Sequence, residues 1–370
     1  MGRSLSVPLV TLVTWKITKD DINVSSDYSV MCTMSQGGIP SRFSSLPPPK
    51  LGLLKGGPVE QVAPDLTPIG TRLAKNYATF AELNEEILPK PTHTPVLVVA
   101  NQKGGVGKTT TSVNLAAALA LGGLKVLLID ADPQGNSSTA LGIPHDQGIP
   151  STYEVILGQI DLREALVECP DVPGLYVCPA TIDLAGAEVE LVEEPDRARL
   201  LRFAIEDFLA DAETGGESGG EGEEKFVPDI VIVDCPPSLG LLTLNAFVAA
   251  SSLIIPVQAE YYALEGLSLL LRTIERIRAD LNPKMGPPHL LMTMVDARTR
   301  LSAEVSREVR DHFGDLVFDT EIPRSVRISE APSYGQTVVT YDEKGAGALR
   351  YREVAGELAA MLATKENPDD

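Results

Sequence analysis

The chain has 370 residues, of which 44% are hydrophobic and 22% are charged. This is enough to bury a full core, and one α/β domain of about 250 residues with additional segments is the natural partition. No apolar run approaches the ~18 residues of a membrane-spanning helix, and the formal net charge of −20 argues against attraction of the whole molecule to nucleic acid, so any DNA site must be a local basic patch.

The first segment, residues 1–66, has Ser, Gly and Pro clusters and no sustained apolar period. We expect it to form a disordered extension. Residues 1–33 lack the charged start, apolar middle and small-residue cleavage site of a signal peptide. Met31 and Met34 are plausible true starts of the chain.

Residues 67–94 are predicted to form an amphipathic helix and a linker. Thr67 and Pro68 supply an N-cap and a first-turn proline, and apolar side chains then recur at helical spacing up to Pro89. A helix packed on its own domain and a helix that docks a partner explain this pattern about equally well.

A glycine loop follows the short apolar run Val96–Ala100, which is typical of a buried parallel strand. The loop resembles the phosphate-binding pattern G-x-x-x-x-G-K-[ST], but Gln102 stands at its first position. Lys108 and Thr109 open the predicted helix Thr109–Leu121, whose N-terminus would face the phosphates. A glycine-rich turn without a ligand is the less favoured alternative.

Lys103 is a second lysine close to Lys108. One lysine can already neutralise the anion in such a cradle, and a second would crowd it. We therefore interpret Lys103 as pointing at a nucleotide held by another subunit.

Acidic residues end two further predicted strands. Asp130 and Asp132 follow the run that starts at Lys125, and Asp234 follows the strand Ile230–Val233. Open α/β sheets bind ligands at the carboxyl ends of their strands, so these carboxylates are candidates for a ligand site. A structural cap is the alternative explanation for a strand-end aspartate.

Strand and helix patterns alternate from Val96 to Leu362, which predicts an α/β fold with a doubly wound, mostly parallel sheet of P-loop NTPase type and helices on both faces. The stretch from Asp183 to Asp229 holds fifteen Asp/Glu against four Lys/Arg, and within it residues 214–225 are predicted to be a flexible acidic insertion. The remaining predicted strands are Gly174–Ala180, Ser252–Val257, His289–Val295 and Phe318–Ile322, and the remaining predicted helices are Asp183–Val192, Tyr262–Leu281, Leu301–Phe313 and Gly347–Leu362.

Several stretches carry a family resemblance. KGGVGKTT, IDADPQGN and IVDCPPSLG resemble the ParA and MinD group of deviant Walker ATPases. PVQAEYYALEGL, TMVDARTRL and IPRSVRISEAPSYGQ most resemble the ParA-type (Soj-like) chromosome-partition ATPases. The resemblance implies an ATPase domain over residues 95–364, followed by an acidic tail at 365–370.

This resemblance implies ATP and Mg²⁺ as cofactors. It implies that Asp132 positions the attacking water, that Thr109 and Asp234 hold magnesium, and that Asp130 supports its shell. Together with Asp132, Lys103 and Lys108 are the candidate catalytic residues. The candidate nucleotide-binding residues are Lys103, Gly104, Gly105, Val106, Gly107, Lys108, Thr109, Thr110 and Pro323, the last of these near the adenine.

Four arginines lie at predicted strand ends and loops, where guanidinium groups can reach phosphates, namely Arg298, Arg300, Arg324 and Arg327. Salt bridges to nearby acids explain the spacing equally well. The resemblance favours nonspecific DNA contacts for Arg298 and Arg327.

The function that the resemblance implies is an ATPase that forms a homodimer on binding ATP, binds double-stranded DNA nonspecifically and drives chromosome or plasmid partition. A ParB-type centromere-binding protein would stimulate hydrolysis, and a polar scaffold protein is a further candidate partner. The acidic C-terminal end lacks the basic amphipathic helix by which MinD-like proteins bind membranes, so no membrane partner is expected.

One other function remains open, a nucleotide-gated scaffold or regulatory ATPase of the same fold. A metal-cluster reductase of the nitrogenase iron-protein kind is disfavoured because the four cysteines contain no C-x-x-C pair and no matching ligand motif. The same cysteine pattern favours a reducing cytoplasm. The resemblance implies that the protein associates with the nucleoid there.

Overall fold

A computed structural model describes residues 67–214, 226–260 and 263–364. The predicted disordered extension, most of the predicted acidic insertion and the acidic tail therefore lie outside the described residues. None of the described helices is long and apolar enough to cross a membrane.

The centre of the molecule is a seven-stranded sheet in the order β3-β4-β2-β5-β1-β6-β7. Every pairing is parallel except that of β3 with β4, which is antiparallel. This confirms the predicted mostly parallel, doubly wound fold. The strands are β1 (Val96–Val99), β2 (Val126–Asp130), β3 (Val167–Glu168), β4 (Leu175–Cys178), β5 (Ile230–Asp234), β6 (Ser252–Gln258) and β7 (His289–Thr293).

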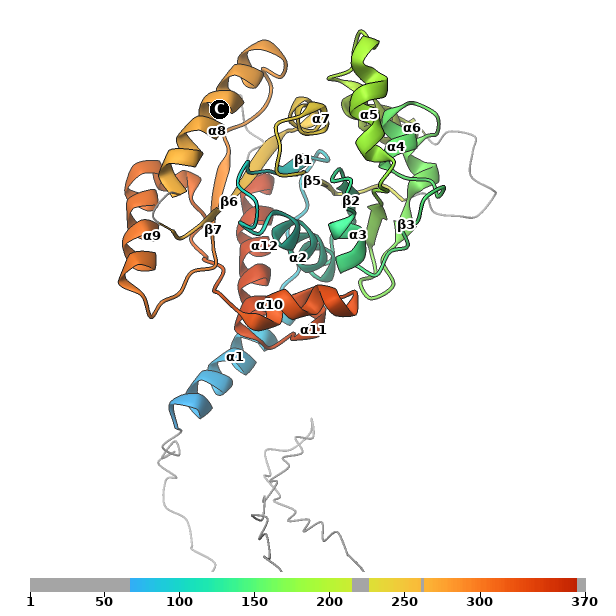
Figure 1. The fold of residues 1–370 in the computed structure, drawn as a ribbon. Coiled ribbons are helices and arrows are strands. Elements are labelled where there is room, and N and C mark those ends of the chain that lie inside the picture. The colour runs from blue at the N-terminus through green and yellow to red at the C-terminus, as the bar shows by residue number, and fades with distance from the viewer. Residues whose placement is uncertain (1–66, 215–225, 261–262, 365–370) are drawn as a thin grey trace, which may run out of the picture. The chain divides into compact units, whose positions relative to one another are not determined.

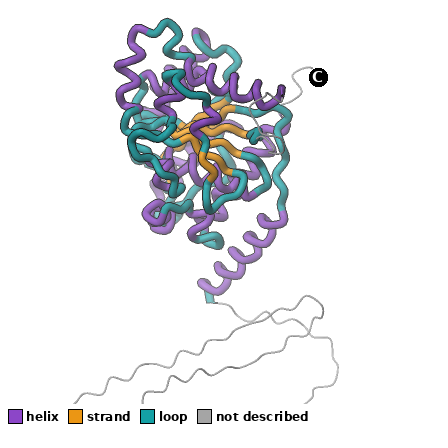
Figure 2. The backbone as a smooth tube through the Cα atoms, turned by 90° about the vertical axis from the view of Figure 1, so that its right-hand side faces the viewer, coloured by secondary structure: helices purple, strands orange, loops and turns teal. Residues whose placement is uncertain are grey.

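Helices cover both faces of this sheet (Figures 1 and 2). The helices are α1 (Pro68–Glu85), α2 (Lys108–Leu121), α3 (Asn136–Ala140), α4 (Thr152–Ile156), α5 (Leu184–Glu190), α6 (Leu200–Thr214), α7 (Leu241–Ala249), α8 (Ala263–Asp280), α9 (Arg300–Phe313), α10 (Val326–Glu330), α11 (Val338–Tyr341) and α12 (Ala346–Thr364). Short 3₁₀ turns are η1 (Leu162–Ala165), η2 (Leu191–Glu193), η3 (Gly314–Leu316) and η4 (Ala331–Tyr334).

The strands alternate their side chains between two buried cores. Val96 and Val98 of β1 pack into a core with α4 to α9, whereas Leu97 and Val99 pack into a second core with α2 and α12. Because both faces are covered, the inner strands are continuously hydrophobic. Helix α2 is apolar on nearly all sides because it lies between the sheet and α12.

The predicted N-terminal helix is present as α1. Thr67 caps it by accepting a hydrogen bond from the Gly70 amide at 3.2 Å. Its C-terminal half packs on α12, where Arg352 donates to Asn84 Oδ1 at 2.7 Å and to the Leu83 carbonyl at 2.6 Å. The helix is thus held by its own domain, as one of the two interpretations of its sequence pattern requires.

The prediction of a strand at Phe318–Ile322 is wrong. The Phe318 and Ile322 amides donate to β7 carbonyls, but only isolated bridges form there. The reason is that the Glu357 carboxylate of α12 accepts from the intervening amides of Asp319 and Thr320, at 2.9 Å each, and so interrupts the ladder.

Candidate nucleotide site

The glycine loop joins β1 to α2 and leads directly into the helix N-terminus. Gly105 and Gly107 have φ of 74° and 92°, a left-handed backbone that only glycine adopts readily. No described atom lies within 4 Å of where a Cβ would stand at these two positions. The loop is anchored from behind, because Thr293 Oγ1 of β7 donates to the Val106 carbonyl at 2.9 Å. This is a suitable cradle for an anion.

Lys108 starts α2 and is largely buried, with 7% of its surface exposed. Burial lowers the pKa of its ammonium group, whereas the charges of Asp234 and Asp132 raise it. The two aspartates therefore lie close enough to act on Lys108, as expected from strand ends that meet at one edge of the sheet.

Asp130 and Asp234 are paired residues on the neighbouring strands β2 and β5, and both are fully buried. Burial and the charge of Asp234 raise the pKa of Asp130 to about 8. Burial also raises the pKa of Asp234 to about 6, against hydrogen bonds from Thr109, Ser112 and Ser137. Two adjacent buried carboxylates are costly unless a cation compensates them.

Three serines hold these carboxylates in place, and sequence reasoning had assigned them no role. Ser112 Oγ donates to Asp234 Oδ1 at 2.8 Å, and Ser137 Oγ donates to Oδ2 at 2.9 Å. Ser138 donates to Asp130 Oδ2 from both its amide and its hydroxyl, at 3.0 and 2.9 Å. The available signal was the position of Ser112 one helical turn after Lys108, and of the other two in the first turn of α3, shortly after Asp132.

The donor set fits Mg²⁺, which prefers oxygen ligands and is commonly held by one or two carboxylates together with phosphate oxygens. Thr109, Asp130 and Asp234 supply such oxygens beside the cradle. Among the described residues, no group of three or more His, Cys, Asp or Glu is placed to bind a metal alone. Further ligands, such as phosphate oxygens and water, would have to complete the coordination.

Asp132 is nearly buried and caps its own turn by accepting from the Gln134 amide at 3.0 Å. The structural cap considered from the sequence is therefore present, and it coexists with the position of Asp132 beside Lys108. Asp130 similarly accepts from the Asp132 amide at 3.2 Å.

Lys103 pairs with an acid of its own subunit. Its Nζ lies 2.9 Å from Glu260 Oε2, and Glu260 Oε1 accepts from Gln258 Nε2 at 2.6 Å. Both partners of the ion pair are about half exposed. Residues at and just after the end of β6 thus hold the Lys103 side chain. From the sequence, Gln258 and Glu260 were expected only to shape the dimer face, and their contact with Lys103 was not predicted.

Comparisons with known proteins place this site in a family. A family model described as an AAA domain matches residues 94–286. The chain is 48% identical over 263 residues to the chromosome partitioning protein ParA of Caulobacter vibrioides, covering 71% of this chain and 93% of that protein. It is 46% identical over 265 residues to the sporulation initiation inhibitor protein Soj of Bacillus subtilis, covering 72% and 98%. The chain belongs to the ParA family.

A solved structure supports the same fold. Cobyrinic acid a,c-diamide synthase from Mycobacterium smegmatis, with bound ADP and magnesium, is 38% identical, with a TM-score of 0.59 over 72% of this chain and 94% of that one. The cell division ATPase MinD of Pyrococcus furiosus shares the fold at 22% identity and a TM-score of 0.56.

The two arginines that the ParA resemblance favours for DNA contact both have acidic neighbours. Arg298 makes a bidentate pair with Asp296, with Nε–Oδ1 and Nη2–Oδ2 distances of 2.9 Å, and these hydrogen bonds lower the pKa of Asp296 to about 2. Arg327 lies 3.1 Å from Glu330. Both arginine side chains are mostly exposed, and such surface pairs contribute little energy, so a phosphate could replace the carboxylate.

The other predicted residues of this ParA-type chain lie nearby in sequence but have different surroundings. Arg300 begins α9, and the Arg324 amide donates to the Val295 carbonyl at 3.0 Å. Pro323 forms an isolated bridge with Val295 beyond the carboxyl end of β7. A contact of Pro323 with adenine stays a prediction.

The raised pKa of Asp130 predicts how the stability of the nucleotide-free protein depends on pH. An unfolded aspartate loses its proton near pH 4, whereas burial raises the pKa of Asp130 in the folded protein to about 8. Between these two pH values the unfolded state binds fewer protons than the folded state, so the free energy of unfolding falls as the pH rises. We expect Asp130→Asn to flatten this fall in nucleotide-free protein, as measured by urea unfolding between about pH 5 and pH 8. The exposed Asp146→Asn should keep the wild-type slope. An unchanged slope in Asp130→Asn would contradict the assignment.

Proposed function

We propose that this chain is a Mg²⁺-dependent ATPase of chromosome or plasmid partition, which dimerises on binding ATP and binds DNA nonspecifically as the dimer. The observation that carries the proposal is the glycine cradle with the buried Lys108 beside Asp234 and Asp132, and with Asp130 paired to Asp234 on the neighbouring strand. It is supported by 46–48% identity to relatives named for chromosome partitioning or as Soj.

In this proposal each residue acts on a phosphate, the metal or a water. The amides from Gly104 to Thr110 would hold the phosphate oxygens, and Lys108 would neutralise the β and γ phosphates. Thr109 and Asp234 would hold magnesium, with Asp130 behind them. Bound magnesium supplies charge neutralisation, and Asp132 orients the attacking water, because phosphoryl transfer depends on positioning and electrostatics.

The proposed DNA contacts are phosphate contacts made by Arg298 and Arg327, with Arg300 and Arg324 beside them in sequence. They carry no base information, so binding would be nonspecific. The proposed location is the cytoplasm, in association with the nucleoid. A ParB-type centromere-binding protein would stimulate ATP hydrolysis, and a polar scaffold protein would be a further partner.

The test is steady-state ATPase activity of the full chain with and without double-stranded DNA and the ParB-type protein of the same organism. We expect a low basal rate that rises only when both are added. A rate that stays unchanged with both present would instead favour the alternative function, a nucleotide-gated scaffold whose hydrolysis is incidental.

We expect Asp132→Ala to bind ATP and to dimerise but to hydrolyse ATP at least about 100-fold more slowly, because water positioning and not phosphate binding is removed. Nucleotide titration and single-turnover hydrolysis separate the two effects. Asp146→Ala, an exposed aspartate in the following loop, is the matched control. Loss of ATP binding in Asp132→Ala would show that its role is misassigned.

A further inference from the structure

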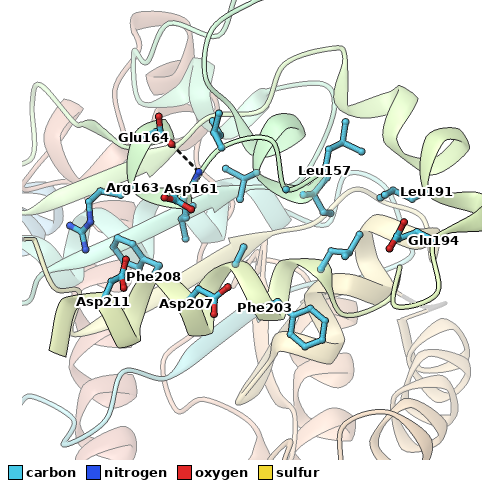
Figure 3. A pocket seen from close by; sticks show the side chains of 17 residues that line it. Leu157, Asp161, Arg163, Glu164, Leu191, Glu194, Phe203, Asp207, Phe208 and Asp211 are labelled. Atoms are coloured by element: carbon cyan, nitrogen blue, oxygen red, sulfur yellow. Dashed lines mark hydrogen bonds between the residues drawn. The ribbon is translucent and has the colours of Figure 1, made fainter. Parts of the chain in front are cut away.

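A cavity of about 690 Å³ lies on the other side of the sheet from α2 and α12. We call it the α6 cavity. One wall is α6, and the opposite wall is the segment from the end of α4 through η1, residues 155–164, with Leu191 and Glu194 at one end (Figure 3). It is lined by neither the glycine loop nor the four arginines, so the nucleotide and DNA proposals leave it unused.

The base of the α6 cavity is apolar. Val155, Ile156, Leu162 and Phe208 are buried at its base, and Phe203, on its rim, is 40% exposed. On α6 the residues Phe203, Asp207 and Asp211 follow one another at helical spacing, so an aromatic ring and two carboxylates line the same side of the helix (Figure 3).

The rim is strongly acidic, with the carboxylates of Asp161, Glu164, Glu194, Asp207 and Asp211. Within the part of the chain that the structure describes, none of these five has an ion-pair partner. An unmatched acidic rim around an apolar floor is complementary to a cationic ligand with an apolar face.

The one basic residue of the lining does not offset this charge at the opening. The Arg163 guanidinium lies 4.7 Å from the centre of the Phe208 ring, and its Nη1 donates to the Phe226 carbonyl at 3.4 Å. Arg163 is therefore held against the wall through its ring contact and Nη1, with Nη2 buried and without a hydrogen-bond partner among the described residues, while the five carboxylate residues are exposed. DNA and an anionic lipid surface would both be repelled by this rim.

We propose that the α6 cavity docks a cationic amphipathic helix of a partner protein. The apolar face of the partner helix would enter the cavity beside Phe203. Lysines or arginines at one-turn intervals along that helix would pair with Asp207 and Asp211 on one border of the cavity, and with Asp161 and Glu164 on the other. The site lies beside β3 and β4, at one end of the sheet, whereas α9 and Arg298 lie by β7 at the other end (Figure 1). A partner could thus bind while Arg298 is occupied.

The test uses the full chain without nucleotide and a fluorescent helical peptide of about 18 residues, with leucines on one face and lysines along both borders. A second peptide carries glutamates in place of the lysines. We expect saturable binding of the lysine peptide only, at micromolar Kd, with slowed amide exchange in α6 and residues 157–164. No saturable binding, or equal binding of both peptides, would overturn the proposal.

Matched variants locate the binding. Asp207→Asn/Asp211→Asn should weaken the lysine peptide about tenfold, since two exposed charge pairs are lost, and Phe203→Ser should weaken it similarly. Glu193→Gln/Glu206→Gln removes two carboxylates that do not line the cavity and should change Kd less than about twofold. Equal weakening in both double variants would mean general attraction to an acidic protein. If Phe203→Ser instead dissociates a peptide-free dimer in sedimentation, the occupant is a second copy and the partner proposal fails.

Discussion

Lys103→Ala is expected to bind ATP as a monomer and to lose hydrolysis by about 10³-fold or more, the effect of removing a charge that acts in trans on a transferring phosphate. The structure adds a physical reason. Lys103 is half exposed and paired with Glu260, and it is not among the described charges that shift the pKa of the buried Lys108. The measurements are ATP affinity, sedimentation with ATP and single-turnover hydrolysis.

Lys90→Ala is the matched control for this variant. Lys90 is also an exposed lysine paired with an acid, Asp229 at 3.2 Å, but it precedes β1, whereas the glycine loop follows that strand. It should hydrolyse ATP as the wild type does. Loss of ATP binding by Lys103→Ala would place Lys103 in its own subunit's site.

A mixture of two variants tests whether Lys103 acts on the nucleotide of the partner subunit. When Lys103→Ala is combined with Lys108→Ala, only the first subunit can hold ATP, and its partner supplies an intact Lys103. We expect the mixed dimer to recover up to about half of the wild-type rate, because one of two sites is complete. Complete absence of hydrolysis in a verified heterodimer would count against action in trans.

The meeting of Asp130 with Asp234 was predictable because parallel strands bring their carboxyl ends to one edge, whatever their distance in sequence. The glycine loop was predictable for a related reason, because a helix N-terminus that follows three glycines is typical of a phosphate-binding site. In both cases a local pattern and a general rule of sheet geometry agree.

The features that sequence could not supply depend on side chains from distant elements. Nothing in the run Phe318–Ile322 reveals that Glu357, on the last helix, takes two of its amides. The pairing of Lys103 with Glu260 likewise joins residues more than 150 positions apart. Such contacts arise only after the sheet has assembled, so local periodicity carries no record of them.

ATP is expected to switch DNA binding on by joining two weak patches. A monomer with about two arginine contacts should bind a duplex poorly, because each neutralised phosphate adds only ~0.9 to the salt slope of affinity. A dimer presents about four contacts, and its second patch binds at high effective concentration. We therefore expect tight, strongly salt-dependent binding with ATP and weak binding with ADP.

Arg298→Glu and Arg327→Glu should each abolish this DNA binding without affecting ATP-dependent dimerisation. Each substitution places a carboxylate where a phosphate must sit, beside the existing Asp296 or Glu330. The loss should be the same for duplexes of any sequence, because phosphate contacts carry no base information. Arg199→Glu is the control, since Arg199 forms a comparable exposed pair with Asp196 just before α6.

The decisive measurement is DNA affinity against salt concentration for the wild type and the three variants, with ATP and with ADP. With ATP, a wild-type slope of about −3.6 for log K against log salt concentration would match four phosphate contacts, and Arg199→Glu should have the same slope. Equal affinity in both nucleotide states would show that dimerisation does not create the DNA site. Wild-type binding by Arg298→Glu and Arg327→Glu would move the basic patch elsewhere, with Arg300 and Arg324 next to be tested.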